Sequence, residues 1–191
     1  MKRIMKDCKD FFYKHDKQII AYSIIVILLF ILVFAYMNLV KLIIFILIIT
    51  ISNTFMRFYK RALPGIPLEF ELTIFSTVLI GIAYGIWPAI FIAIFSSLCA
   101  DFLNQNIMSP FSLVSLGTYI LIALVSPFLS SSNIFVIGMV IVVIANLIIF
   151  FGNIAMGYHD QIKNFAYSAT NIFFNYFLFK YLAVFILGLL M

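Results

Sequence analysis

The chain contains few charged residues for its length. Only 10% of its 191 residues are Asp, Glu, Lys or Arg, whereas 65% are hydrophobic. A soluble globular domain carries about 25% charged residues, so this composition excludes a fold that is stable in water. Because a helix needs about 20 apolar residues to cross a bilayer, the length leaves room for six or seven spanning helices in one membrane domain.

Residue types that support catalysis or metal binding are also scarce. The two cysteines, Cys8 and Cys99, are far apart and form no disulfide framework. The two histidines, His15 and His159, lie in polar flanking segments, and no nucleotide-binding loop, metal motif or nucleophile elbow occurs. We therefore expect no enzymatic activity, no catalytic residue, and no metal or other cofactor.

The apolar residues form continuous runs and not the alternating pattern of a membrane β-barrel. The sequence therefore predicts an all-α, polytopic helical bundle over residues 18–191. The basic leader before it, residues 1–17, is either a short interfacial helix or a solvated tail. The predicted spans cover about residues 18–37, 39–57, 69–84, 89–103, 111–129, 134–153 and 162–189.

Basic residues predict the orientation, because cytoplasmic loops of membrane proteins are rich in Lys and Arg. Seven spans with a cytoplasmic N-terminus place the leader and four further basic residues on the inner side, namely Arg57, Lys60, Arg61 and Lys163. Lys41 falls on the outer side, and Lys180 lies within the last span. We therefore expect a multi-pass protein of the cell membrane with a cytoplasmic N-terminus.

Two acidic residues, Glu69 and Glu71, begin the predicted span 69–84. A helix N-terminus stabilises a carboxylate, so capping is one interpretation, and lining of a ligand cavity by one of them is the other. Residues two apart on a helix point about 200° away from each other. On this prediction the two carboxylates cannot face the same pocket.

Small residues recur every four positions towards the end of span 69–84 and through span 89–103. This stripe consists of Gly81, Gly85, Ala89, Ala93, Ser97 and Asp101. Small residues at this spacing let helix backbones approach closely, which predicts either packing within the bundle or docking of a partner. Asp101 lies near a helix C-terminus, where a carboxylate is disfavoured and needs compensation.

Amide side chains recur on the last two predicted spans. Asn146 and Asn153 are seven residues apart, and Asn171 and Asn175 are four apart, so each pair shares a helix face. Amides within a membrane need hydrogen-bond partners. They either join helices to each other or line a polar cavity, which Lys180 would face unless it extends to the membrane surface.

Several short motifs resemble known membrane families. The chain reads Pro67-x-Glu69-x-Glu71, then Tyr84-Gly85-x-Trp87-Pro88, then a small-residue helix ending Ala100-Asp101-Phe102-Leu103, then Ser112-Leu113-x-Ser115-Leu116-Gly117. This order resembles the substrate-binding S components of energy-coupling-factor (ECF) transporters, and also the similarly arranged MreD-like rod-shape proteins. The stretch from Thr170 to Phe179 is similar to their last helix, so the resemblance covers about residues 39–179.

The resemblance implies a six-helix core, residues 39–189, with one extra N-terminal helix at 18–37. For S components it further implies a small-molecule site near the outer side and docking onto a membrane T component with ATPases. Two departures are visible. The docking motif Ala-x-x-x-Ala occurs at Ala89 and Ala93 and is missing from the first core helix, and charge counting places the start of that helix outside, whereas both families start inside.

The leading functional prediction is a substrate-binding subunit of an ECF-type transporter for a vitamin or small nutrient. Its ligand site would consist of Glu71, Trp87, Asn146, Asn171 and Asn175. The alternative is an MreD-like scaffold that organises envelope or cell-shape partners and binds no ligand. Both place the chain in the lipid bilayer, and neither involves nucleic acid.

Overall fold

A computed structural model describes residues 22–27, 36–62, 68–103, 109–129 and 133–191 of the chain. The chain divides into two units, Met1–Lys41 and Leu42–Met191. In the first unit, residues 22–27 are helical. The predicted leader and most of the predicted span 18–37 lie outside the described residues.

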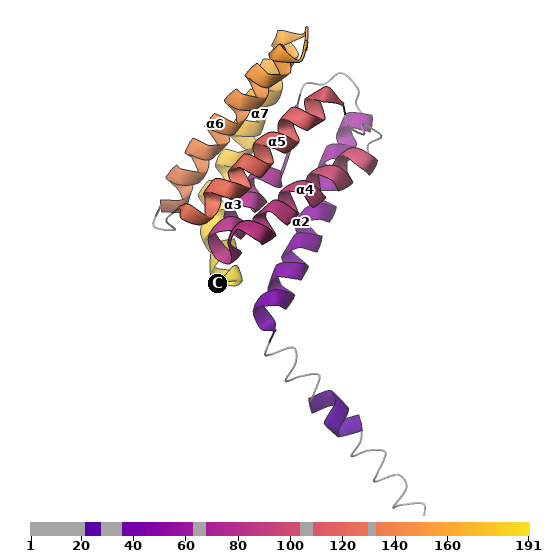
Figure 1. The fold of residues 1–191 in the computed structure, drawn as a ribbon, viewed down its shortest axis with the longest axis vertical. Helices are drawn as coiled ribbons and strands as arrows, with labels where there is room; N and C mark the ends of the chain where they lie inside the picture. Colours follow the sequence, from indigo (N-terminus) through magenta and orange to yellow (C-terminus); the bar gives the residue numbers. More distant parts are fainter. Residues whose placement is uncertain (1–21, 28–35, 63–67, 104–108, 130–132) are drawn as a thin grey trace, which may run out of the picture. The chain divides into compact units, whose positions relative to one another are not determined.

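The second unit is built from helices, and no strand occurs among the described residues. Figure 1 shows its elements in chain order. They are α2 (Met37–Ala62), which begins before the division, α3 (Thr73–Tyr84), α4 (Ile86–Leu103), α5 (Pro110–Val125), η1 (Ser126–Phe128), α6 (Ile134–Ala155), α7 (Gln161–Phe177), η3 (Leu178–Leu182) and α8 (Ala183–Leu190). The predicted all-α fold is confirmed.

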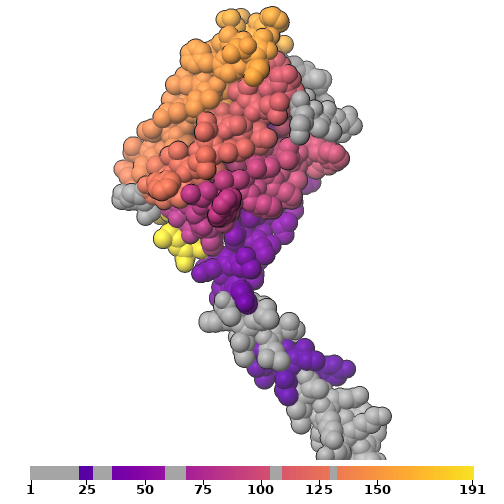
Figure 2. All heavy atoms as spheres, viewed as in Figure 1, coloured from indigo at the N-terminus to yellow at the C-terminus, as the bar shows by residue number. Residues whose placement is uncertain are grey.

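Five described segments are long and apolar enough to cross a membrane. They are Met37–Phe58, Ile86–Leu103, Pro110–Phe128, Ile134–Ala155 and Gln161–Leu190. Large hydrophobic side chains such as Ile144, Phe151 and Phe173 are exposed on them. A surface of this kind is stable against lipid and unstable against water, so the chain is a multi-pass membrane protein. In Figure 2, α4, α5 and α6 lie side by side on the face of the second unit that is in view.

The centre of the second unit is α3, which packs against α4, α5 and α8. It has only 12 residues, and every residue from Thr73 to Gly81 is buried. The prediction began this span at Glu69, but residues 68–72 are not helical. Irregular backbone is tolerated at membrane depth where protein surrounds it, and α3 is the helix that the other helices enclose.

The small-residue stripe divides at Gly85, the single residue between α3 and α4. Gly85 has a φ of +88°, a conformation that glycine adopts readily, and it ends α3. Beyond it, Ala89, Ala93 and Ser97 are buried on one face of α4. Gly81 lies against Ser126 of η1, where an added Cβ would overlap the serine side chain. Gly85 therefore makes a turn, and the other small residues occupy the interior.

The predicted span 162–189 is a helix with a local irregularity. Between α7 and α8, the five residues of η3 form a π-helical turn. Lys180 lies in this turn with an exposed side chain, and its Nζ lies 2.9 Å from the Tyr176 hydroxyl and over the Tyr176 and Tyr181 rings. Lys180 therefore does not face the polar side chains between the helices, and its extension to the membrane surface stays a prediction.

Close packing of α6 against η3 gives a stability prediction. Gly138 on α6 lies directly on the buried ring of Phe179, so a methyl group there would overlap the ring. We expect Gly138→Ala to destabilise the protein by about 1–3 kcal/mol, as overpacking of a core does. The measurement is thermal unfolding in detergent. Gly188→Ala is the matched control, because an added Cβ there meets nothing within 4 Å; equal melting temperatures of the two variants would contradict the prediction.

Candidate ligand cavity

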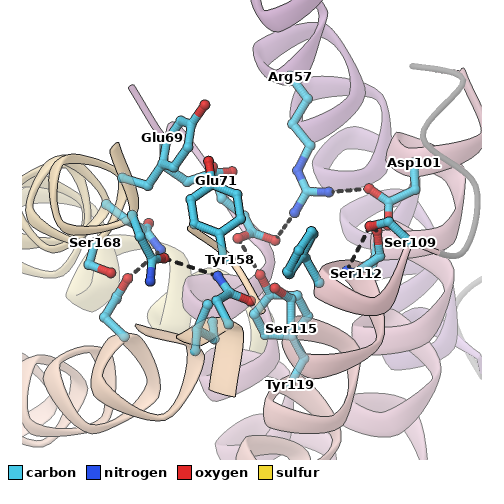
Figure 3. Close-up of a pocket in the computed structure, with 18 residues that line it drawn as sticks. Arg57, Glu69, Glu71, Asp101, Ser109, Ser112, Ser115, Tyr119, Tyr158 and Ser168 are labelled. Atoms are coloured by element: carbon cyan, nitrogen blue, oxygen red, sulfur yellow. Dashed lines mark hydrogen bonds and ion pairs between the residues drawn. The ribbon is translucent and has the colours of Figure 1, made fainter. Parts of the chain in front are cut away.

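A guanidinium group joins three parts of the second unit. Arg57, near the end of α2, is only 7% exposed. Its Nη1 donates to Asp101 Oδ1 of α4 at 2.7 Å, and its Nη2 pairs with Glu71, which precedes α3 (Figure 3). Hydrogen bonds to ionised groups are stronger than neutral ones. The pairing also supplies the compensation that Asp101 needs near the C-terminal end of α4.

Glu71 brings a fourth element into the cluster. Its carboxylate is 1% exposed, with one oxygen on Arg57 and the other accepting from the Tyr119 hydroxyl of α5. Buried carboxylates are costly unless they are paired and hydrogen-bonded. Glu71 is therefore held on both oxygens by groups from two different helices.

Residues just outside the cluster explain why Glu71 points inward. Asn53 lies one helical turn before Arg57 and is fully buried. Its Oδ1 accepts from the backbone N–H of Leu72, and its Nδ2 donates to Thr73 and to Ser96, each at 3.0 Å. On the other side of the segment, the Glu69 N–H donates to Thr170 Oγ1 at 2.9 Å. Residues 69–72 are thus attached to both α2 and α7.

The two acidic residues of this segment correct a prediction. Glu69 and Glu71 were expected on a helix, facing away from each other, yet both line the same cavity (Figure 3). The reason is that residues 68–72 are not helical, so the 100° rotation per residue of a helix does not apply. The capping interpretation is also wrong, because the first turn of α3 contains no acidic residue.

A second set of polar side chains, all of them amides, connects α6 to α7. Asn171 Nδ2 donates to Asn146 Oδ1 at 3.2 Å, and Asn175 Nδ2 donates to Asn171 Oδ1 at 2.7 Å. Nearer the connection between the helices, Asn153 Nδ2 donates to Asn164 Oδ1 at 3.1 Å. The predicted role of amides in joining helices is therefore present between α6 and α7.

These groups surround a cavity of about 410 Å³. Its lining is formed by Arg57, Glu69, Glu71, Ser97, Asp101, Ser109, Phe111, Ser112, Ser115, Tyr119, Asn146, Ile149, Asn153, Tyr158, Asn164, Tyr167, Ser168 and Asn171. They come from α2, α4, α5, α6 and α7, from the segment before α3, and from the connections that precede α5 and α7. The cavity therefore lies at the end of the bundle where the chain passes from α2 to α3, from α4 to α5 and from α6 to α7.

Three of the five predicted ligand residues are brought together. Glu71, Asn146 and Asn171 line the cavity. Asn175 is fully buried one turn further along α7 and bonds to Asn171 outside the lining. Trp87 is 81% exposed in the first turn of α4 and is absent from the lining. A ligand role for these residues stays a prediction, with Trp87 outside this cavity.

Sequence reasoning missed Arg57 and Tyr119. Arg57 was placed at the inner end of the predicted span 39–57 and counted with Lys60 and Arg61. Carboxylates within membrane segments require a partner, but Lys60 and Arg61 are nearer to Glu71 in the sequence, so the sequence did not single out Arg57. Tyr119 shares a helix face with Ser112 and Ser115, a polar stripe on an apolar helix that also pointed inward.

Tyr158 and Asp160, in the connection between α6 and α7, have shifted pKa values and lie outside the spans. Partial burial raises the pKa of Tyr158, so its phenol stays neutral in the lining at physiological pH. Asp160 caps α7 by accepting from the backbone N–H of Lys163 at 3.0 Å, which lowers the pKa of Asp160. The cavity end of α7 therefore begins with an ionised cap.

Comparisons with protein families, with curated proteins and with solved structures found no match to this chain. The resemblance to S components and MreD-like proteins therefore stays a prediction. The site is described below from its own chemistry, which is that of a hydroxyl- and amide-rich cavity with one guanidinium and three carboxylates among the described lining residues.

The shared guanidinium gives the second prediction. We expect Arg57→Leu to cost about 3–5 kcal/mol, because removal of one partner leaves buried carboxylates uncompensated. Thermal unfolding in detergent measures the loss, and adding Glu71→Gln and Asp101→Asn should recover part of it. Lys163→Met is the control, since the pair of Lys163 and Asp160 is largely solvent-exposed and should contribute nothing measurable. An Arg57→Leu variant as stable as the wild type would refute the central role of this group.

Proposed function

We propose that the chain is a substrate-binding subunit of an ECF-type membrane transporter, which captures a vitamin or another small polar nutrient. The observation that carries this proposal is the polar cavity enclosed by spanning helices. Its volume of about 410 Å³ falls in the range of about 300–1,000 Å³ that is usual for small-molecule sites. Ionisable groups within membrane segments commonly mark substrate pathways because they are too costly to keep otherwise.

The polar character of the lining supports a polar ligand. Arg57 pairs with Glu71 and Asp101 in the wall of the cavity. Hydroxyl and amide groups make up much of the remaining lining, including Ser112, Ser115, Asn146 and Asn171. A ligand with several hydrogen-bonding groups would complement them. A T component with ATPases is the partner expected for such a subunit.

An MreD-like scaffold is the second candidate, and one observation favours it. Arg57 pairs with Glu71 and Asp101, and Tyr119 donates to Glu71, without any ligand. In a scaffold, the role of this cluster is structural: it fixes the positions of α2, α3, α4 and α5. Envelope or cell-shape partners would then bind the outer surface of the bundle, and the cavity would contain water and no ligand.

Filling the cavity separates the two candidates. Ser115→Leu adds volume to the lining, and the structure shows no side-chain hydrogen bond of Ser115 that would be lost. Native mass spectrometry of the protein extracted gently from its host should find a bound small molecule in the wild type, reduced at least tenfold in Ser115→Leu. Gly117→Leu is the control, because an added Cβ there meets nothing within 4 Å. A wild type that carries no small molecule but retains membrane or cytoskeletal partners would favour the scaffold.

Orientation provides an independent test. A capture subunit for uptake needs its cavity end on the outer side, whereas charge counting with seven spans puts that end inside. One of the inner-side charges weighs little in that count, because Arg57 is buried in ion pairs with Glu71 and Asp101. The proposed function therefore requires the connection between α6 and α7 to face outward.

Cysteine labelling in intact cells measures this. In a background with Cys8 and Cys99 replaced by Ser, His159→Cys lies at the cavity end and Met191→Cys at the other end, and both positions are exposed. A membrane-impermeant maleimide should label His159→Cys and spare Met191→Cys until the cells are opened. The reverse pattern would exclude capture from outside.

A further inference from the structure

Lys180 is a charged residue on the outer surface of the last spanning segment. It is the twentieth of the 30 residues in Gln161–Leu190, and its side chain is exposed. Ten residues, about 15 Å of helix, separate it from Leu190. A charged side chain at such a position in a span is costly, and residues of this kind commonly mark a functional contact.

The ammonium group of Lys180 is held away from the nearer end of the helix. Its Nζ donates to the Tyr176 hydroxyl at 2.9 Å and lies 5.1 Å and 5.4 Å from the centres of the Tyr176 and Tyr181 rings. Tyr176 precedes Lys180 by one turn, so the side chain reaches back towards the cavity end of α7 and not towards Leu190. Two aromatic rings therefore hold the cation against the side of the helix, within the span.

No carboxylate among the described residues neutralises this cation. The described acidic side chains gather at the cavity end of the bundle, where Glu69, Glu71 and Asp101 line the cavity and Asp160 caps α7. A second copy of the chain therefore has no described carboxylate to offer at this depth. An ammonium group has three N–H donors and no acceptor, so Lys180 can bind an acidic group that another molecule supplies.

An apolar groove adjoins Lys180 on the same surface. It has a volume of about 570 Å³ between α6 and α7, and its lining includes Phe165, Ala169, Phe173 and Tyr176. Tyr176 thus lines the groove and also accepts the hydrogen bond of Lys180. Spanning helices associate through close packing of side chains and through polar contacts. The groove offers the first and Lys180 the second.

We propose that a spanning helix of a partner membrane protein docks on this surface, with a carboxylate on Lys180 and apolar side chains in the groove between α6 and α7. Charge complementarity determines the chemistry of the partner, because a carboxylate offsets the cost of the cation and the cation offsets that of the carboxylate. The inference does not depend on what the polar cavity contains, since neither Lys180 nor Tyr176 lines it.

The test uses two synthetic spanning peptides of leucine and alanine that differ at one central residue, which is Glu or Gln. The peptides carry a fluorescence acceptor, and the full chain carries a donor on Met191→Cys, with both native cysteines replaced by Ser. Energy transfer in phosphatidylcholine vesicles measures binding, at a mildly alkaline pH that favours ionised Glu. Lys180→Met removes the cation. Lys163→Met is the matched control, because this exposed lysine near the other end of the span already pairs with Asp160.

We expect the wild type to bind the Glu peptide about fivefold more tightly than the Gln peptide, the size of one polar contact between spanning helices. Lys180→Met should bind both peptides equally, Lys163→Met should keep the wild-type preference, and Lys180→Arg should keep part of it. Equal binding of the two peptides by the wild type, or a preference that survives in Lys180→Met, would overturn the inference. A preference that disappears when phosphatidylglycerol is added would overturn it in favour of an anionic lipid headgroup. The proposed function is tested separately, by the Ser115→Leu variant.

Discussion

The second unit depends on one cation, Arg57, which is shared by two carboxylates from other parts of the unit. Arg57 ends the apolar part of α2, and its two terminal nitrogens reach Glu71 before α3 and Asp101 near the end of α4. Each of these groups alone would be expensive within a membrane. Together with Tyr119 they join α2, α4, α5 and the segment before α3, and all four residues line the cavity.

That dependence explains why polar residues gather at one end of an otherwise apolar bundle. The chain reverses direction there three times, and each connection brings backbone groups that need partners. Asn53 and Thr170 bind the segment before α3, and Asn153 and Asn164 join α6 to α7. Asn153 and Asn164 also line the cavity, and Asn164 donates to the backbone oxygen of Phe150, so the fold and the candidate site share some of their hydrogen bonds.

The helical fold was predictable because continuous apolar runs permit no other structure in a bilayer. The membrane-spanning segments from Ile86 onward begin and end within three residues of their predicted positions. The spacing of the amides along each helix predicted that they point inward. Asn146 and Asn171 are indeed buried and hydrogen-bonded to each other. Glu69 and Glu71 were misjudged because the prediction extended a helix through a segment that tertiary contacts hold irregular. Arg57 was missed because its neighbours in sequence are loop-like cations, and only the fold reveals that carboxylates from α4 and from the segment before α3 surround it.

The length of α3 has a geometric consequence. Its 12 residues span about 18 Å, whereas the 22 residues of α6 span about 33 Å. A bundle whose central helix is shorter than the helices around it has an axial recess where the missing turns would lie. Because Glu69 and Glu71 lie in the segment that replaces those turns, the depth of the recess is set by the residue at which the central helix begins. Changes that move this residue would deepen or close the recess without altering any of the surrounding helices.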